Sequence, residues 1–327
     1  MRRHRQESGA DRAQHPGRAQ RPDDTAMDQA DPALPEPERI DFQLDSRELH
    51  LFRWSRPGAP RVLLVHGIGM GHSVYDRFLS EIQTECEAIA IDLPGFADCP
   101  EPADPLTMPQ TADLVAAALR SLGIGSLVAV GHSMGAQVVS ELAARHPDLV
   151  RRVVLIAPSV NPAERTALMQ GYRMIQDLAE GEPLSVLRKA TKTYLQAGPV
   201  WFLRKLRQML AHRLEHCLPR VSQPALVIQG TRDHVSPRGW AVRITGLLPD
   251  AEMRQIQDRG HEALISSGQP VARHVLEWIG ADEAPRSPGA DSSDSPGADS
   301  SGSAATARPA LAAEELASGI SHADAVT

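Results

Sequence analysis

Six short apolar runs, separated by segments with a helical period, most restrict the fold of this 327-residue chain. Runs this short, bounded by Gly, Pro or Asp, are typical of strands buried on both faces of a parallel sheet. Alternation of such strands with helices predicts an α/β fold with a doubly wound, mostly parallel sheet. The apolar runs lie at 62–65, 88–91, 127–130, 153–156, 225–228 and 253–256, and the helical periods at 74–82, 108–122, 134–144 and 271–278.

A hairpin is predicted before the first of these runs. Ile40, Phe42 and Leu44 alternate with polar residues, and a turn at Ser46 leads into a second apolar stretch that ends near Trp54. A period of two indicates an antiparallel pair of strands with one buried face. The hairpin brings the predicted sheet to about eight strands.

The strand–helix alternation stops between the fourth and fifth runs. About 60 residues contain no strand-like run there, and three stretches at 162–179, 183–196 and 199–216 have helical character. We therefore predict a helical lid inserted at about 159–221.

The two ends of the chain differ from the rest in composition and charge. Residues 1–21 carry a net charge of +4, residues 22–38 carry −6 and residues 282–327 carry −6, which leaves about +1 on residues 39–281. The ends also lack the apolar residues that a core requires, so we predict disordered tails at 1–38 and 282–327 and one folded domain at 39–281. No large basic surface is available for duplex nucleic acid.

No targeting or membrane-spanning segment is evident. The chain has no run of 18 apolar residues, and its arginine-rich start is not followed by an apolar segment. Cys86, Cys99 and Cys217 are odd in number and widely spaced, which does not fit a disulfide framework or a CxxC pair. We predict a soluble cytoplasmic protein, with translation starting at either Met1 or Met27.

The pentapeptide GHSMG at 131–135 directly follows a predicted strand and directly precedes a predicted helix. In this place G-x-S-x-G is typical of a sharp turn on which a strained serine raises its Oγ above the sheet. Gly131 and Gly135 are required because a Cβ at either position would collide with the neighbouring strand or helix. Ser133 is the candidate nucleophile, and a glycine-rich turn in an ordinary α/β unit is the alternative.

The tetrapeptide HGIG at 66–69 follows the first run and provides a candidate oxyanion hole. A tetrahedral intermediate needs two N–H donors, each contributing about 3–4 kcal/mol in measured cases. The candidates are the N–H of Ile68 and the N–H of Met134 at the positive end of its helix. A nucleotide-binding loop is the competing interpretation, but its third glycine is replaced by His72. We expect His66 to form structural hydrogen bonds.

Asp233 and His261 are the candidate partners of Ser133. Both follow late strands, so their loops lie at the carboxyl edge of the sheet, where open α/β sheets place their sites. The chain order Ser, Asp, His is the one expected for such a sheet. His261 Nε2 would take the proton from the serine, and Asp233 would accept the Nδ1–H and fix the tautomer. The loop after the fourth run has no carboxylate before Glu164, which favours Asp233 as the acid.

Over about residues 39–281 the chain resembles the α/β-hydrolase fold family in its lidded, single-domain form. The resemblance implies a serine nucleophile, an oxyanion hole from Ile68 and Met134, and no cofactor. Serine at position 133 disfavours the dehalogenase and epoxide-hydrolase branches, and Phe96-Ala97 stands where many relatives have His-Gly. The motifs, in family order, are HGIG at 66–69, DLPGF at 92–96, GHSMG at 131–135, GTRD at 230–233 and GH at 260–261.

The predicted lid bears on the substrate. Residues 162–220 carry ten Lys or Arg and five Asp or Glu, a net charge of +5. Such charge is usually solvated, and attraction of an anionic ester or a lipid surface is the alternative. Core packing accounts for most of the apolar stripe on the last lid helix. Trp201, Phe202 and Leu206 in this stripe are candidates for an apolar acyl or aromatic pocket over Ser133.

The sequence HRLEH at 212–216 matches the H-x-x-E-H signature of zinc peptidases. No separate domain surrounds it, and a solvated basic helix face is the better interpretation. We predict neither a metal nor a cofactor.

These features predict a serine hydrolase that cleaves a small to medium carboxylic ester through an acyl-enzyme. A thioesterase, a lactonase, a C–C bond hydrolase and a cofactor-free perhydrolase are alternatives that use the same three residues. A ligand-binding receptor with a vestigial triad is the non-enzyme alternative. In each case the expected partner is a small molecule, and the oligomeric state is not predicted.

Overall fold

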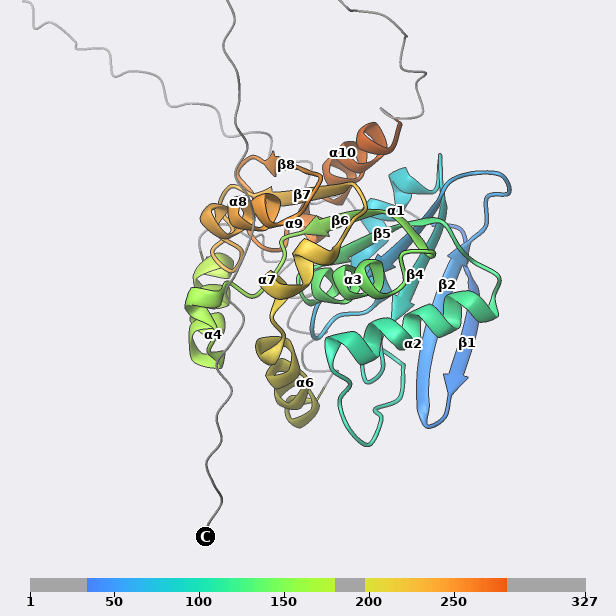
Figure 1. Ribbon diagram of the computed structural model, residues 1–327, viewed down its shortest axis with the longest axis horizontal. Coiled ribbons are helices and arrows are strands. Elements are labelled where there is room, and N and C mark those ends of the chain that lie inside the picture. The colour runs from blue at the N-terminus through green and yellow to red at the C-terminus, as the bar shows by residue number, and fades with distance from the viewer. Residues whose placement is uncertain (1–33, 180–197, 281–327) are drawn as a thin grey trace, which may run out of the picture. The chain divides into compact units, whose positions relative to one another are not determined.

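The computed structural model describes residues 34–179 and 198–280 (Figure 1). The strands in these residues form one sheet with the order β1-β2-β4-β3-β5-β6-β7-β8. Strand β2 pairs antiparallel with β1 and β4, and the other neighbours pair parallel. The predicted sheet with its leading hairpin is thereby confirmed. The strands are β1 (Glu38–Leu44), β2 (Arg47–Trp54), β3 (Arg61–Val65), β4 (Glu87–Asp92), β5 (Leu127–His132), β6 (Val150–Ile156), β7 (Ala225–Gly230) and β8 (Ala251–Ile256).

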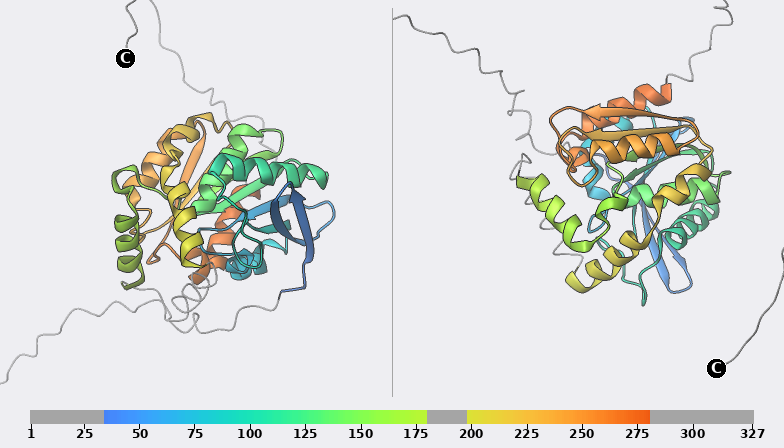
Figure 2. Two further views of the ribbon diagram at one scale, coloured as in Figure 1. Left: turned by 90° about the horizontal axis from the view of Figure 1, so that it is seen from below. Right: turned by 60° about the vertical axis from the view of Figure 1, so that its left-hand side comes forward.

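Helices flank the sheet on both faces (Figures 1 and 2). The α-helices are α1 (Asp76–Ile82), α2 (Met108–Ser121), α3 (Met134–Arg145), α4 (Ala167–Ala179), α6 (Pro199–Ala211), α7 (Leu214–Cys217), α8 (Arg238–Leu247), α9 (Ala263–Ser266) and α10 (Gly268–Gly280). Short 3-10 helices are η2 (His72–Tyr75), η3 (Pro162–Glu164) and η4 (Leu218–Arg220).

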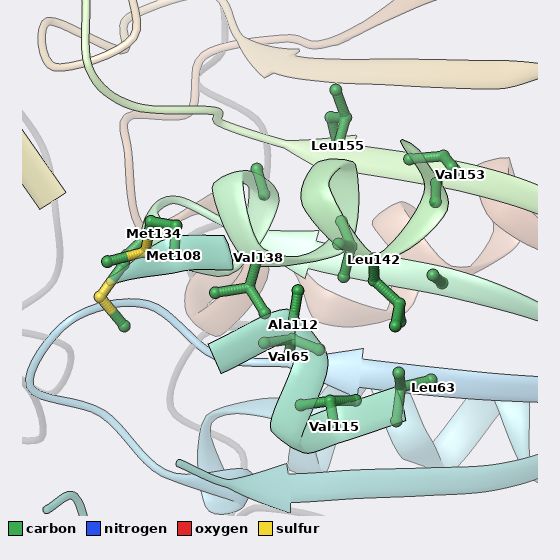
Figure 3. Close-up of a cluster of buried hydrophobic side chains, with 14 of the residues drawn as sticks. Leu63, Val65, Met108, Ala112, Val115, Met134, Val138, Leu142, Val153 and Leu155 are labelled. Carbon is green, nitrogen blue, oxygen red and sulfur yellow. The ribbon is translucent and has the colours of Figure 1, made fainter. Parts of the chain in front are cut away.

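Two apolar clusters, one on each face of the sheet, form the core. Leu63 and Val65 of β3 pack with residues of α2, α3 and α8, whereas Val62 and Leu64 pack with residues of α1 and α10. Successive side chains of a strand point to opposite faces, so a continuous apolar run supplies both clusters. Figure 3 shows part of the first cluster, with side chains from β3, β6, α2 and α3. Each fully buried Leu or Val contributes about 1.5–3 kcal/mol.

The insertion, residues 157–224 between β6 and β7, is helical in its described parts. The predicted stretch at 162–179 divides into η3 and α4, and the stretch at 199–216 divides at His212, where the backbone is extended. The stretch predicted at 183–196 lies outside the described residues. The action of the insertion as a lid stays a prediction.

Helix α3 holds α6 in place. Gln137 Nε2 donates to the carbonyl oxygens of Ser159 at 3.1 Å and Met209 at 3.2 Å. His212, at the end of α6, lies with its Nε2 2.9 Å from Glu141 Oε1. The insertion is therefore attached to the same helix that follows the candidate nucleophile.

Some features differ from the sequence-based expectations. Helix α8 was not predicted, although Trp240, Ala241 and Ile244 on it are buried. Before the predicted start at residue 39, Leu34 packs on the second core cluster and the Pro35 carbonyl accepts a 2.8 Å hydrogen bond from Trp54 Nε1. Residues 34–38 of the predicted N-terminal tail are thus described, and the rest of both predicted tails lies outside the described residues.

No helix within residues 34–179 and 198–280 has both the length and the apolar character needed to cross a membrane. Cys86, Cys99 and Cys217 are buried, and none of the three forms a disulfide bond.

Lys205 attaches α6 to the start of α2. Its side chain is only 2% exposed, and Nζ donates to the Leu106 carbonyl at 2.8 Å and to Thr111 Oγ1 at 3.3 Å. Burial lowers the pKa of Lys205 to about 7, because the charged ammonium has lost most of its hydration.

The stability of a Lys205→Met variant should therefore depend on pH differently from that of the wild type. The cost of burying the ammonium is complete below pH 7 and disappears as the pH rises from about 7 toward 10.5, the range in which only the unfolded state keeps the proton. We expect the stability of the variant relative to the wild type to be greater at pH 6 than at pH 9 in urea unfolding. The exposed Arg204→Met serves as control, and an equal difference at both pH values would contradict the prediction.

Candidate active site

Ser133 lies on a strained turn between β5 and α3. Its backbone has φ 53° and ψ −112°, in the left-handed region that non-glycine residues rarely adopt. A Cβ at Gly131 would lie 2.4 Å from the Gly135 carbonyl oxygen, and one at Gly135 would lie 2.0 Å from the Val65 carbonyl oxygen. Both glycines are required, as predicted, because α3 begins in close contact with β3 and β5.

The structure brings Ser133, Asp233 and His261 together at the carboxyl edge of the sheet. His261 Nε2 lies 3.0 Å from Ser133 Oγ, and Nδ1 lies 3.0 Å from Asp233 Oδ2. All three side chains are buried. Asp233 Oδ1 accepts a 2.6 Å hydrogen bond from the N–H of Ser236, which fixes the carboxylate. This chain of hydrogen bonds has the geometry needed to move the serine proton to the imidazole.

Electrostatics favour the protonated imidazole. Burial is the largest single influence and lowers the pKa of His261, but the charge and hydrogen bond of Asp233, with smaller contributions from Glu262 and Asp177, together outweigh it. The outcome is a pKa of about 9. An imidazolium formed during proton transfer is therefore well stabilised.

Two further residues hold the His261 backbone, and the sequence analysis assigned no role to either. His132 Nε2–H donates to the His261 carbonyl at 3.2 Å, and burial, followed by the nearby His261, lowers the pKa of His132 to about 3. Asp177 of α4 accepts hydrogen bonds from the N–H groups of His261 at 2.7 Å and His234 at 3.0 Å. The position of His132 inside GHSMG was a usable signal, whereas Asp177 lies 84 residues before His261 without a motif.

The loop of the candidate oxyanion hole lies directly beside the nucleophile. A Cβ at Gly67 would be 3.3 Å from Ser133 Cβ, and Ile68 lines the cavity that contains Ser133. His66 forms structural hydrogen bonds, donating from Nδ1 to the Gly67 carbonyl at 2.7 Å and accepting at Nε2 from the Leu93 N–H at 3.0 Å. The Met134 N–H is the first of α3 and has no preceding intrahelical carbonyl to bond.

A cavity of about 620 Å³ opens above Ser133. Its described lining contains no Asp, Glu, Lys or Arg, and its polar side chains are those of Ser133, Ser159, Gln170 and His261. Ser159 Oγ lies 3.2 Å from Ser133 Oγ. The lining residues are Ile68, Ser133, Ser159, Ala167, Gln170, Gly171, Met174, Ile175, Pro199, Phe202, Leu203, Leu206, Met209, Val235 and His261.

The three candidate substrate-binding residues divide between two environments. Phe202 and Leu206 line the cavity, whereas Trp201 does not. The Trp201 indole is buried against Gly95, where an added Cβ would lie 2.1 Å from its ring. The expectation that Trp201 contacts substrate is corrected, because Trp201 packs between α6 and the loop after β4.

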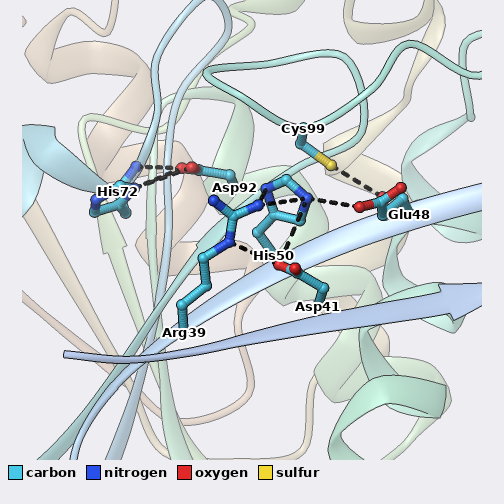
Figure 4. A network of polar contacts seen from close by, with 7 residues as sticks. All are labelled: Arg39, Asp41, Glu48, His50, His72, Asp92 and Cys99. Atoms are coloured by element: carbon cyan, nitrogen blue, oxygen red, sulfur yellow. Dashed lines mark hydrogen bonds and ion pairs between the residues drawn. The ribbon is translucent and has the colours of Figure 1, made fainter.

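Neither group of potential metal ligands resembles a metal site. In the H-x-x-E-H sequence His212 bonds to Glu141, while Glu215 pairs with Arg165. Asp41, Glu48 and His50 form the second group, the one such cluster found in residues 34–179 and 198–280. Figure 4 shows the Arg39 guanidinium beside them. Its Nε lies 2.8 Å from Asp41 Oδ1, and its Nη2 lies 3.3 Å from each ring nitrogen of His50. This cation already pairs with Asp41, one of the two carboxylates of the cluster.

Comparison with known proteins identifies the family. The model of the "Alpha/beta hydrolase family" matches residues 62–274. The chain belongs to the alpha/beta hydrolase family. The poly(3-hydroxyalkanoate) depolymerase of Ectopseudomonas oleovorans is 25% identical over 68% of this chain and 87% of its own length. The pimeloyl-[acyl-carrier protein] methyl ester esterase of Chromobacterium violaceum is 26% identical over 71% of this chain and 98% of its own length.

A solved structure shares the fold of this alpha/beta hydrolase. The crystal structure of a membrane phospholipase A, described as a bacterial virulence factor, superposes with a TM-score of 0.66. It covers 76% of this chain and 87% of the other, at 22% sequence identity.

The pH profile of this alpha/beta hydrolase should reflect the His261 environment. A general base must be neutral in the free enzyme, so we expect kcat/KM for an activated ester to rise with pH up to about 9. Asp233→Asn removes the main charge that raises this pKa, so the rising limb should move to lower pH while turnover falls by about four orders of magnitude.

Asp258→Asn is the matched control for this experiment. Asp258 is half exposed and pairs with Arg232. The Asp258→Asn variant should therefore keep the wild-type pH profile of kcat/KM. A loss below tenfold in the Asp233→Asn enzyme would mean that another group orients His261.

Proposed function

We propose that this protein is a serine hydrolase that cleaves neutral carboxylic esters with an apolar acyl group of medium length. The observation that supports this function best is the position of Ser133 Oγ, which lies 3.0 Å from His261 Nε2 in a cavity with an apolar lining. No metal or cofactor enters the proposed reaction.

In this reaction Ser133 Oγ forms a bond to the ester carbonyl carbon while its proton passes to His261 Nε2. The carbonyl electron pair moves to oxygen, which accepts hydrogen bonds from the N–H groups of Ile68 and Met134. Collapse of the intermediate breaks the ester C–O bond, and the alcohol leaves with the proton from His261. Water, deprotonated by His261, then attacks the acyl-enzyme, and the acid and free Ser133 are released. Asp233 stabilises the imidazolium in both steps.

The part of the cavity lining that the structure describes favours a neutral substrate over an anionic one. Burying a substrate carboxylate against Phe202, Leu206 and Met174 without a partner would cost several kcal/mol. C–C bond hydrolysis of dicarboxylates is therefore disfavoured relative to ester hydrolysis. One relative is named a methyl ester esterase, which is in keeping with an ester substrate.

We further propose that the insertion is the lid of the cavity. Helices α4 and α6 lie side by side (Figures 1 and 2), and both contribute to the lining. Ile175 and Leu203 line the cavity yet are 69% and 60% exposed, which supports an entrance between the two helices.

A fluorophosphonate probe tests the nucleophile. We expect covalent labelling and ester hydrolysis in the wild type and neither in Ser133→Ala, because the probe requires an activated serine. Ser80→Ala, a serine on α1 outside the cavity lining, is the control. Labelling that persists in Ser133→Ala would reject this nucleophile, and a well-folded wild type without labelling would favour the ligand-binding receptor.

A series of p-nitrophenyl esters tests the pocket. Phe202→Ala and Leu206→Ala should lower kcat/KM for octanoate esters by about tenfold or more and leave acetate esters within about twofold, because only the longer chain reaches α6. Val200→Ala, on the same helix but 70% exposed and outside the lining, is the matched control. Equal losses for both esters would contradict the assignment of α6 to the acyl pocket.

A further inference from the structure

We propose that Asp177 is a positioning residue that fastens helix α4 to the loops of both Asp233 and His261. Through this contact, one wall of the substrate cavity sets the orientation of the catalytic imidazole. The inference rests on the proposed function, since it concerns how the base of that reaction is held.

Both carboxylate oxygens of Asp177 are used. Oδ2 accepts the hydrogen bond from the His261 N–H at 2.7 Å, and Oδ1 accepts the one from the His234 N–H at 3.0 Å. His234 directly follows Asp233, so a single buried side chain joins the loop after β7 to the loop after β8. Burial raises the pKa of the Asp177 carboxyl, and the nearby His261 together with the two N–H donors opposes that rise.

The shape of the neighbouring backbone fits this contact. A Cβ at Gly260 would lie 2.5 Å from Asp177 Oδ2. Gly260 is not among the glycines with positive φ, so conformation alone does not require glycine there. The carboxylate of Asp177 accounts for the absence of a side chain at position 260.

Helix α4 carries this carboxylate and part of the cavity wall. Gln170, Gly171, Met174 and Ile175 line the cavity, and Asp177 follows within the same helix. A shift of α4 on substrate binding would therefore move the carboxylate that accepts the hydrogen bond from the His261 N–H. Substrate in the cavity and the loop of the catalytic base would therefore both contact helix α4.

The charge of Asp177 provides a readout that a purely structural residue would lack. Burial lowers the pKa of His261, whereas Asp233, Glu262 and Asp177 raise it, and among the described residues the buried His132 ring also lies beside it. Loss of the Asp177 charge should lower the pKa of His261. The acid limb of activity should then move to lower pH.

Asp177→Asn is the first test. The amide is isosteric, but it removes the charge and presents an NH2 group to one of the two N–H donors. We expect kcat to fall by at least about tenfold, as for loss of a hydrogen bond to a charged group, and the acid limb of kcat/KM to move to lower pH. The rate of fluorophosphonate labelling against pH should change in the same way, without any assumption about the natural substrate.

Glu164→Gln is the matched control. It makes the same acid-to-amide change in an ion pair with Arg173 of α4, away from His261. We expect kcat and the pH profile to stay within about twofold of the wild type, since no backbone N–H of a catalytic loop is lost.

Gly260→Ala should disrupt the same hydrogen bonds of Asp177, since the added methyl group would displace the Asp177 carboxylate. We expect a similar loss of kcat and a similar shift of the acid limb. The loss should not add to that of Asp177→Asn in the double variant.

The positioning role would be overturned if the folded Asp177→Asn variant kept the wild-type kcat and an unshifted acid limb of kcat/KM. Additive losses of kcat in the double variant would also overturn it. A folded wild type without Ser133-dependent labelling would instead overturn the proposed function.

Discussion

The close contact between α3 and β3 is the constraint on which the candidate site depends. With no side chain at Gly135, α3 starts against the Val65 carbonyl, directly after β5. The chain can turn this sharply only if Ser133 adopts its left-handed conformation, at a cost of about 1–3 kcal/mol. Burial of α3 in the core offsets that cost. Gln137 and Glu141 on the same helix bond to the insertion. Helix α3 therefore supports both the nucleophile and a wall of the cavity.

The His261 loop is fixed by partners from separate parts of the chain. The ring nitrogen Nδ1 bonds to Asp233, the carbonyl to His132, and the N–H to Asp177. These partners lie after β7, at the end of β5 and on α4. Three anchors leave the imidazole little freedom, which is the preorganisation that proton transfer requires. The same carboxylates that orient the ring also stabilise its positive charge.

Sequence reasoning succeeded where the determinants were local. The apolar runs of the parallel strands and the glycine pattern around Ser133 depend on neighbours along the chain, and the strands were confirmed. Asp233 and His261 could be chosen because each lies in the loop that follows a predicted strand. Asp177 could not, since a carboxylate on an amphipathic helix is normally solvated, and only the fold brings this one to the amide of His261.

Helix α6 shows why an apolar stripe does not by itself identify a pocket. Trp201 and Lys205, four residues apart, share the buried face that packs on Gly95 and the start of α2. Phe202 and Leu206, each one residue further along, form the face that lines the cavity. Residues four apart lie on the same helix face, whereas adjacent residues diverge by about 100°. The sequence could locate the stripe but not its rotation about the helix axis, which is set by the fit of the Trp201 indole over a glycine.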